Sequence, residues 1–416
     1  MKLTRRFFLK SSGIALVGLS AVPSFLTRAA AATTRRGKIL VVLFQRGAAD
    51  GLNIVVPHAE KAYYRMRPSI AIPRPRQGDA NAALDLDGRF GLHPVLEPLK
   101  RLYDEGLLAA VQAAGSPDST RSHFDAQDFM ESGTPGRKST PDGWLNRYLQ
   151  AARAEKASSF RGIAMTPQLP RILQGTAPAL AIPNVERFGI DAGRYTGVVS
   201  GGLEALYGNT SDALLGSTGR ETFEAVKLLE SVNPSQYRPA NGAQYPAGPF
   251  GQTMLQVAQM IKSDLGVEIV FAESGGWDHH VNEGGSEGQL ANLLRQLGGG
   301  LAAFARDLGD RMEDVVVVTL SEFGRTASEN GNRGTDHGHA NALFVLGGPV
   351  RGGKVYGQWP GLEREQLFEE RDLALTTDFR DVLGEVLVHH MGAASLGGVF
   401  PGYDARPEKF RRFLRS

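Results

Sequence analysis

The chain of 416 residues has 42% hydrophobic and 22% charged residues, which is ordinary for a globular protein and excludes a collagen-like or fully disordered chain. Its length suggests one large domain or two modest ones. It contains no cysteine, so a disulfide framework, a thiolate zinc site and a cysteine nucleophile are excluded. Any bound metal must therefore have oxygen and imidazole ligands.

Residues 1–32 predict an export signal that is cleaved from the mature protein. A basic start containing TRRFFLK is followed by the apolar stretch SGIALVGLSAVPSFL and by the small residues RAAAA. This order is typical of a signal peptide rather than of a membrane span. The pair Arg5 and Arg6 favours export by the twin-arginine machinery over a plain secretory signal or a retained anchor. We therefore expect a periplasmic or secreted protein whose mature chain has no stable membrane span.

Loss of the signal changes the charge of the protein. Five of the 46 basic residues lie in the signal, which holds no acidic residue, so 41 basic residues remain against 44 acidic ones and the net charge is about −3. A protein that binds nucleic acid nonspecifically needs a basic surface that neutralises phosphates. Nucleic acid is therefore not expected as a partner.

Beyond the signal, apolar strands alternate with helical segments. The continuous apolar run at residues 39–44 predicts a strand that is covered on both faces. Similar reasoning predicts strands at residues 107–115, 267–274, 314–320 and 342–348, and helices at residues 93–106, 122–132, 144–154, 253–266, 289–308 and 378–392. Alternating strands and helices imply a mainly parallel sheet with helices on both faces. Residues 185–247 are less regular and predict an insertion or cap over this sheet.

Polar residues gather where the predicted strands end or begin. They are Arg46 and Asp50 after the first strand, Asp278, His279 and His280 after residue 274, Glu322 and Arg325 after residue 320, and Asp336, His337 and His339 before residue 342. Ligands of parallel sheets bind beyond the carboxyl ends of the strands. Because parallel strands share a direction, we expect the first three of these loops to lie on one edge of the sheet.

Each of these residues also has a purely structural interpretation. Asp50 precedes Gly51, and Asp-Gly is a common turn pair. Asp278 suits a helix N-cap or an Asx-turn. Glu322 has a ready ion-pair partner in Arg325. His279 and His280 are adjacent and point in different directions, so at most one of them, preferably His280, is expected to be a ligand.

The loop GTDHGH, residues 334–339, is the strongest candidate for a metal-binding loop. We expect Gly334 and Gly338 to let the backbone bend sharply, so that Asp336, His337 and His339 point inward together. Zinc and similar divalent ions take this set of nitrogen and oxygen ligands. The alternative is a polar turn that contains two histidines by chance.

Ser122 lies where a helix is predicted to begin. With Asp125 three residues later it resembles a capping box, which is the structural interpretation. The functional interpretation is a nucleophile at a helix N-terminus, where free N–H groups and the helix dipole favour an anionic substrate. Arg121 would add positive charge. Both roles compete for the same hydroxyl.

The motifs together closely resemble the DUF1501 family, exported bacterial proteins catalogued as a domain of unknown function. They are the twin-arginine signal, QRGAADGLN, RSHFDAQDFMESG, GGWDHH, SEFGRT with ENGNRGTDHGHA, and TTDFRDVLGEVL, and they span nearly the whole mature chain. That family is similar to a distant branch of the alkaline phosphatase and sulfatase superfamily. The resemblance implies a three-layer α/β/α sandwich with a mainly parallel sheet, a single domain over residues 37–416, a metal site at the strand ends, and hydrolysis of phosphate or sulfate esters.

The superfamily pattern implies roles for particular residues. Asp50 corresponds to the aspartate that binds one metal ion after the first strand, although it lies several residues beyond the usual place. Ser122, followed by Gly133 at the helix end, corresponds to the nucleophile. Asp278 and His280 correspond to the aspartate and histidine that bind the other ion, with a shortened spacing.

The chain departs from this pattern after the strand DVVVVTL. Glu322 stands in the place of an aspartate ligand, and Phe323 stands where a histidine ligand is usual. His339, before a strand that ends in glycines, matches the last histidine ligand. Either the site holds one metal ion instead of two, or Asp336 or His337 fills the vacancy. Both remain open on the sequence.

The resemblance therefore implies an exported metal-dependent hydrolase that acts on a small anionic ester or on a sulfated or phosphorylated glycan. Ser122 would attack the ester, and Arg46 or Arg325 would hold the anionic group. The cofactor would be one or two divalent ions, zinc in the first place, with calcium, manganese or magnesium as alternatives. The competing hypothesis, from another class, is a non-catalytic metal-binding protein of the periplasm or cell surface with a degenerate hydrolase site.

Overall fold

The computed structural model describes residues 37–152, 160–186 and 236–415, together with residues 158, 188 and 225–229. The predicted signal peptide lies outside the described residues. Most of the predicted insertion at residues 185–247 lies outside them as well. Among the described residues, no helix combines the length and the apolar character that crossing a membrane requires.

A nine-stranded sheet forms the centre of the described part of the chain, in the order β11-β5-β10-β9-β1-β8-β6-β7, with β12 paired to β5. The strands are β1 (Ile39–Gln45), β5 (Leu108–Gly115), β6 (Gly162–Ala164), β7 (Leu180–Ala181), β8 (Ile269–Ser274), β9 (Val315–Leu320), β10 (Asn341–Gly347), β11 (Lys354–Tyr356) and β12 (Thr377–Asp378). A small second sheet contains β2 (Val55–Val56), β3 (Leu84–Asp85) and β4 (Gly91–Leu92).

Strand β10 alone among the strands of the large sheet described here runs against the others. It pairs antiparallel with both β5 and β9, whereas β1 pairs parallel with β8 and β9, and β11 and β12 pair parallel with β5. The beginning of β10 therefore lies at the same edge of the sheet as the carboxyl ends of β1, β8 and β9. This places the loop before β10 beside the loops that follow those strands.

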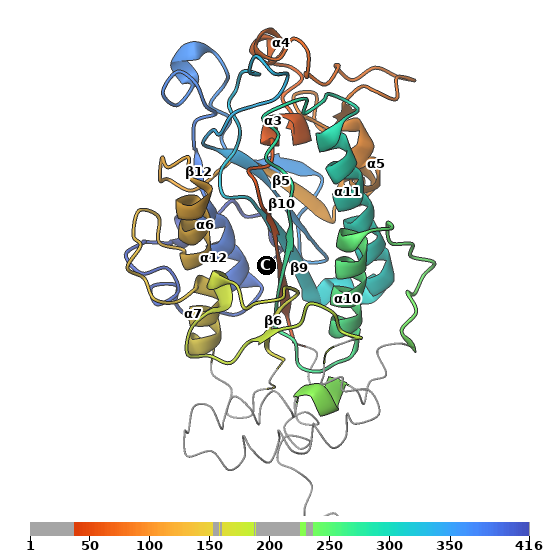
Figure 1. The fold of residues 1–416 in the computed structure, drawn as a ribbon, viewed down its shortest axis with the longest axis vertical. Helices are drawn as coiled ribbons and strands as arrows, with labels where there is room; N and C mark the ends of the chain where they lie inside the picture. Colours follow the sequence, from red (N-terminus) through yellow and green to blue (C-terminus); the bar gives the residue numbers. More distant parts are fainter. Residues whose placement is uncertain are drawn as a thin grey trace, which may run out of the picture.

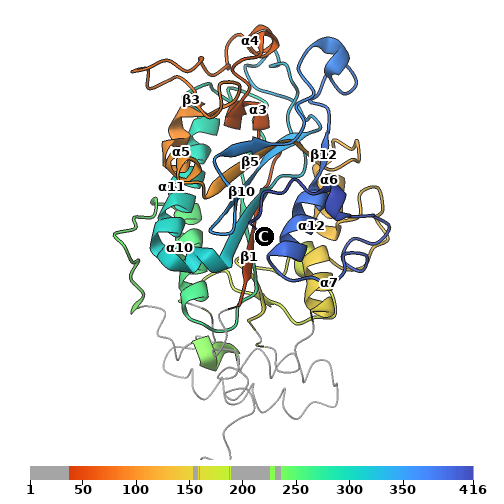
Figure 2. The same cartoon turned by 180° about the vertical axis from the view of Figure 1, so that it is seen from behind.

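Helices cover both faces of the sheet. Their bounds are α3 (Gly51–Ile54), α4 (Lys61–Met66), α5 (Glu97–Asp104), α6 (His123–Ser132), α7 (Trp144–Ala151), α10 (Pro249–Lys262), α11 (Gln289–Leu308) and α12 (Phe379–His389). Helices α5, α10 and α11 lie on one side of the sheet and α6, α7 and α12 on the other (Figure 1). The view from behind shows the same two groups (Figure 2).

The core divides in the same way, which explains why β1 is apolar at every position from Ile39 to Phe44. Ile39, Val41 and Leu43 belong to the cluster that includes α10 and α11. Leu40, Val42 and Phe44 belong to the cluster that includes α7 and α12. Successive side chains of a strand point to opposite faces, so a strand buried on both faces must be apolar throughout. The predicted three-layer α/β/α sandwich with a mainly parallel sheet is confirmed.

Most predicted elements appear within a few residues of their predicted bounds. The helix at residues 93–106 begins as a 3-10 turn at Pro94–Leu96 before α5, and α7 ends at Ala151 rather than at residue 154. Gly133 ends α6 with φ of 67°, a left-handed conformation that suits glycine. The short elements α3 and β2 were not predicted, because the polar sequence around Asp50 resembles a loop.

Candidate metal centre

Four polar loops lie at one edge of the large sheet. Three of them follow β1, β8 and β9, and the fourth precedes the antiparallel strand β10. Helix α6 begins at the same edge, because the end of β5 leads into it and β5 runs parallel to β1. Side chains far apart in the sequence are thereby brought together.

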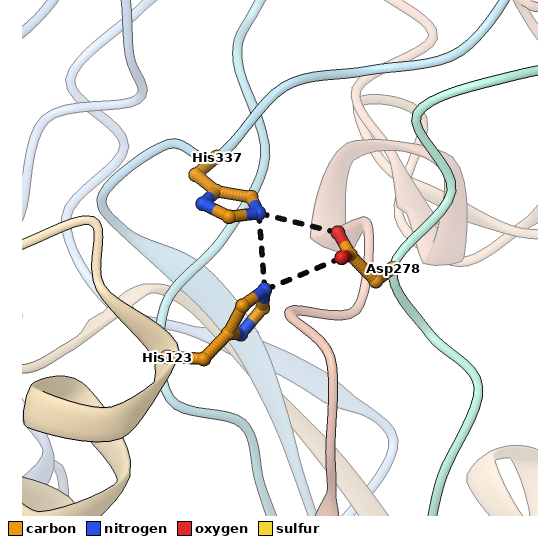
Figure 3. A group of neighbouring side chains, drawn as sticks. All are labelled: His123, Asp278 and His337. Carbon is orange, nitrogen blue, oxygen red and sulfur yellow. Dashed lines mark hydrogen bonds and ion pairs between the residues drawn. The ribbon is translucent and has the colours of Figure 1, made fainter.

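Three imidazoles and one carboxylate converge at this edge. The Nε2 atom of His337 lies 3.0 Å from Nε2 of His123 and 3.0 Å from Nε2 of His280. Asp278 Oδ1 lies 3.2 Å from His337 Nε2 and 3.0 Å from His280 Nε2, and Asp278 Oδ2 lies 3.4 Å from His123 Nε2. Figure 3 shows His123, Asp278 and His337 directed toward one another, and a ligand atom from each lies within 4.8 Å of the others.

The far side of the His337 ring fixes its tautomer. Its Nδ1 lies 2.8 Å from the backbone carbonyl oxygen of Arg121. A carbonyl only accepts hydrogen bonds, so Nδ1 must carry the hydrogen. In the neutral ring, Nε2 then presents a lone pair to the cluster.

The other two rings are fixed in the same way by carboxylates. His123 Nδ1 lies 2.8 Å from Glu322 Oε1, and His280 Nδ1 lies 2.9 Å from Asp336 Oδ1. Ionised carboxylates are acceptors only, so each Nδ1 donates, and in the neutral ring each Nε2 has its lone pair directed at the cluster. Metal-bound histidines commonly donate their second nitrogen to a carboxylate or a backbone carbonyl in this manner.

Such an arrangement requires positive charge between the rings. Lone pairs on nitrogens 3.0 Å apart repel each other unless a proton or a cation lies between them. Three imidazole nitrogens and a carboxylate oxygen also form a donor set of the kind that binds divalent transition metals. The residues therefore fit a divalent metal ion, which would be held by His123, His337 and Asp278, whose ligand atoms all lie within 4.8 Å of one another. His280, whose Nε2 lies beside His337 and Asp278, would be the fourth ligand.

Glu322 supports His123 from inside the protein. Its side chain is fully buried, and it accepts hydrogen bonds from Gly47 N at 2.9 Å, Gln127 Nε2 at 2.8 Å and Ser321 Oγ at 3.1 Å as well as from His123. Burial raises the pKa of Glu322, but hydrogen bonds from His123 and Gln127 outweigh it, so the pKa lies below its ordinary value. The hydrogen bond to Glu322 in turn raises the pKa of His123.

Asp278 is anchored by Arg325, whose NH1 donates to Oδ1 at 2.7 Å. Burial raises the pKa of Asp278, but the hydrogen bond and charge of Arg325 lower it further than burial raises it. The remaining Arg325 donors bind Thr335, through Nε at 3.1 Å to its hydroxyl and NH2 at 2.6 Å to its carbonyl oxygen. Arg325 therefore joins the loop after β8 to the loop before β10. Its buried guanidinium is hydrogen-bonded to Asp278 and Thr335.

Several predicted site residues lie outside this cluster. Asp50 is buried and pairs with Arg67. Arg46 forms ion pairs with Glu131 at 2.8 Å and with Glu273 at 2.7 Å.

His339 is buried and stacks on Phe368, with ring centroids 4.3 Å apart. It does not take part in the group formed by His123, Asp278 and His337. Asp336 lies on the outer side of that group, because it contacts the Nδ1 rather than the Nε2 of His280. His279 is buried with its Nδ1 unpartnered among the described residues, so of the two adjacent histidines only His280 enters the cluster.

Ser122 is the N-cap of α6, directly before His123. Its side chain makes no capping hydrogen bond, so the predicted capping box with Asp125 does not form. Asp125 instead pairs with Lys138 at 2.7 Å. The Ser122 hydroxyl is therefore available at the N-terminus of a helix, next to a residue of the cluster.

Phe323 forms an apolar wall of the cluster. It is buried, and its ring centroid lies 5.0 Å from those of both His123 and His337. The position that holds a histidine in the superfamily pattern therefore packs against the imidazoles instead of adding one. Of the two residues expected to compensate, His337 contributes its ring to the cluster.

His123 was missed by reasoning from the sequence. It lies in the motif RSHFDAQDFMESG, in which only Ser122 was predicted to have a role, as a nucleophile or a helix cap. It follows no strand directly, so a search for polar residues at strand ends passes over it. One feature of the sequence could have indicated His123 as a site residue: it is the first residue of a helix that begins after the buried strand β5.

The glycines of the GTDHGH loop allow close packing rather than the predicted sharp bend. Neither Gly334 nor Gly338 has a positive φ. A Cβ atom on Gly334 would lie 2.4 Å from the backbone carbon of His280, and one on Gly338 would lie 2.4 Å from that of Arg325. The loop can therefore approach His280 and Arg325 only because these two glycines lack side chains.

A family model described as a protein of unknown function (DUF1501) matches residues 108–398. The chain belongs to the DUF1501 family. The match includes α6, the two loops that supply the cluster, and strands β5, β8, β9 and β10. A search of curated proteins found no match.

Solved structures that match this chain include a sulfatase and a phosphonate monoester hydrolase. The Zn complex of the C-terminal periplasmic domain of EcEptC from Escherichia coli shares 11% identity, with a TM-score of 0.34 over 75% of this chain and 73% of that one. PsFucS1 sulfatase from Pseudoalteromonas sp. shares 12% identity, with a TM-score of 0.37 over 94% and 73%. The phosphonate monoester hydrolase of Agrobacterium radiobacter shares 10% identity, with a TM-score of 0.31 over 90% and 79%.

The close packing of Gly334 predicts that a substitution there displaces the loop of residues 334–339. The affinity for the metal should then fall, although every ligand is still present. Gly334→Ala places a methyl group against the His280 backbone and should weaken zinc binding by about tenfold or more, as changes around metal ligands commonly do. A methyl group on Gly331 would have no other atom within 4 Å, so Gly331→Ala is the matched control. Calorimetric titration of both variants with zinc checks this, and equal affinities would contradict it.

Proposed function

We propose that the protein binds one divalent metal ion through His123, His280, His337 and Asp278, and that this ion is zinc. The observation that carries the proposal is the convergence of three imidazole Nε2 atoms, each on a ring that is oriented by an acceptor at its Nδ1. Calcium and magnesium prefer oxygen ligands, whereas a nitrogen-rich set suits zinc. The donor set therefore favours zinc over calcium, manganese or magnesium.

We further propose that the metal serves hydrolysis of phosphate or sulfate esters. A bound zinc ion would polarise the ester and stabilise negative charge on its oxygens. Ser122 Oγ would form a bond to phosphorus or sulfur while the bond to the alcohol oxygen breaks. The serine would release its proton to solvent, the departing alcohol oxygen would take one up, and a water molecule would then hydrolyse the serine ester and restore Ser122. Free N–H groups at the start of α6 support binding of the anionic group.

The surroundings of the cluster favour esters whose alcohol part carries a ring. Phe124 follows His123 directly, and its side chain is 89% exposed. An exposed aromatic ring provides an apolar surface for an aryl group or a sugar. We therefore propose aryl esters and sulfated or phosphorylated glycans as substrates, with aryl phosphates and aryl sulfates as the probes.

A non-catalytic metal-binding function is the second candidate, and two observations favour it. Three imidazoles and one carboxylate suffice to complete a four-coordinate zinc site, and structural zinc sites are closed in this way. Arg46 and Arg325, the residues expected to hold the anionic group, are both engaged in ion pairs. The role of Asp278 distinguishes the two candidates. If Asp278 left the metal and paired only with Arg325, the metal would keep three histidine ligands and one open coordination position for a substrate.

We also propose that the protein acts in the periplasm or outside the cell after twin-arginine export. The TRRFFLK run and the Ala-rich segment that follows support this. Export of a folded protein would allow the metal to be bound before transport.

Metal content tests the proposed centre. The mature protein should retain about one zinc ion per chain after gel filtration, and His123→Ala should retain much less, because it removes a ligand of the cluster. His389→Ala is the control, since His389 is exposed on α12. Elemental analysis of the three proteins gives the answer. Equal metal content in His123→Ala and wild type would exclude the cluster as the binding site.

Activity toward aryl phosphates and sulfates separates the two candidates. If Ser122 is the nucleophile, Ser122→Ala should lower kcat/KM by about a thousandfold or more, while Ser119→Ala, at an exposed serine three residues earlier, should not. Because Ser122 makes no capping hydrogen bond, its removal should cost less than the roughly 1 kcal/mol lost with a bonded cap. Activity that survives in Ser122→Ala would remove this serine as nucleophile, and a wild type inactive on every ester would favour the non-catalytic candidate.

The export signal predicts a specific effect of a conservative change. Replacing both Arg5 and Arg6 by lysine should leave an uncleaved precursor in the cytoplasm, because the twin-arginine machinery reads the arginine pair. Lys2→Arg preserves the pair and is the control. Cell fractionation with immunodetection measures the outcome, and normal export of the double-lysine variant would point to a plain secretory signal.

A further inference from the structure

A second group of charged side chains, separate from the candidate metal centre, is centred on Asp50. Both oxygens of Asp50 face the guanidinium of Arg67: NH1 donates to Oδ2, and NH2 donates to Oδ1 at 3.0 Å. Oδ1 also accepts from Leu52 N at 3.3 Å. The side chains of Arg67 and Asp50 are buried, with 0% and 2% of their surfaces exposed. Both carboxylate oxygens of Asp50 are therefore bound by the guanidinium of Arg67.

Arg67 is held by all five of its N–H groups. Besides its two bonds to Asp50, NH1 donates to Asn53 Oδ1 at 2.8 Å, Nε to the Ala327 carbonyl oxygen at 2.9 Å, and NH2 to the Thr326 carbonyl oxygen at 2.8 Å. A guanidinium has five N–H donors and stays protonated in proteins. Displacing it would leave its acceptors unpaired in the interior, which is costly.

The neighbouring carboxyl group offers no second ligand for a cation. Glu283 is fully buried, and its Oε2 accepts a hydrogen bond from Thr335 at 2.7 Å. Burial and then the negative charge of Asp50 raise the pKa of Glu283 well above its ordinary value. The charge of Asp50 is already matched by the guanidinium of Arg67, and Arg325 adds positive charge nearby. A divalent ion placed beside Asp50 would therefore have to compete with two arginine side chains.

We infer that Arg67 occupies the place of a second metal ion, so that the protein binds a single ion and Asp50 is a partner of Arg67 rather than a metal ligand. This inference rests on the proposed metal centre and specifies the number of its ions. Arg67 is a positioning residue. It fixes Asp50 and the carbonyl groups of Thr326 and Ala327, which directly follow Arg325, the partner of Asp278.

The test is the metal stoichiometry of the mature protein, measured by elemental analysis after loading with excess zinc and gel filtration. One ion per chain is expected. Two ions per chain would overturn this inference and leave the proposed centre intact. No bound ion would overturn the proposed centre, and this inference with it. The two failures are therefore distinguishable.

A double variant provides a second measurement. Arg67→Met with Asp50→Asn removes both charges together, which avoids an unpaired charge in the interior. If Asp50 is not a ligand, the double variant should still bind one zinc ion per chain, and its Kd should rise by no more than about a hundredfold, the upper range for changes around metal ligands. A folded double variant that binds no zinc, or whose Kd rises well beyond about a hundredfold, would show that Asp50 binds the metal and would overturn the inference.

Discussion

The candidate site depends on the hydrogen at Nδ1 of each of three histidines. Once Glu322, Asp336 and the Arg121 carbonyl accept these hydrogens, the opposite nitrogen of each neutral ring offers a lone pair to the space between the rings. The three acceptors come from three different segments, and each orients a ring of the cluster. A metal ion in this space would accept the lone pairs. The hydrogen bonds at the three Nδ1 atoms therefore order the loops and also favour a positive charge between the rings.

The fold meets this requirement through one reversed strand. Because β10 runs antiparallel to β9, its preceding loop lies beside the loops that follow β8 and β9. Gly334 and Gly338 then allow this loop to pack against the backbone of His280 and Arg325. Arg325 holds Asp278 and Thr335 at once. The buried ion pair of Arg67 and Asp50 supports the next residues of the same segment, because Arg67 donates to the carbonyl oxygens of Thr326 and Ala327.

Much of this arrangement could be predicted from the sequence, because it depends on local patterns. The apolar run within Ile39–Gln45 indicates a doubly covered strand, and the dense polar loops mark the edge where a site forms. Other features depend on contacts between distant residues. The direction of β10 is not encoded in its composition, and the pairing of Arg67 with Asp50 gives no local signal. His123 resembles an ordinary first residue of a helix, and only the three-dimensional structure brings it 3.0 Å from His337.

The central claim is that one metal ion lies between the three Nε2 atoms and Asp278. The most direct measurement is a crystal structure of the zinc-loaded mature protein with diffraction data collected on both sides of the zinc absorption edge. A single anomalous peak in contact with His123, His280 and His337 is expected. A peak at Asp50, or a zinc ion bound away from these three rings, would contradict it.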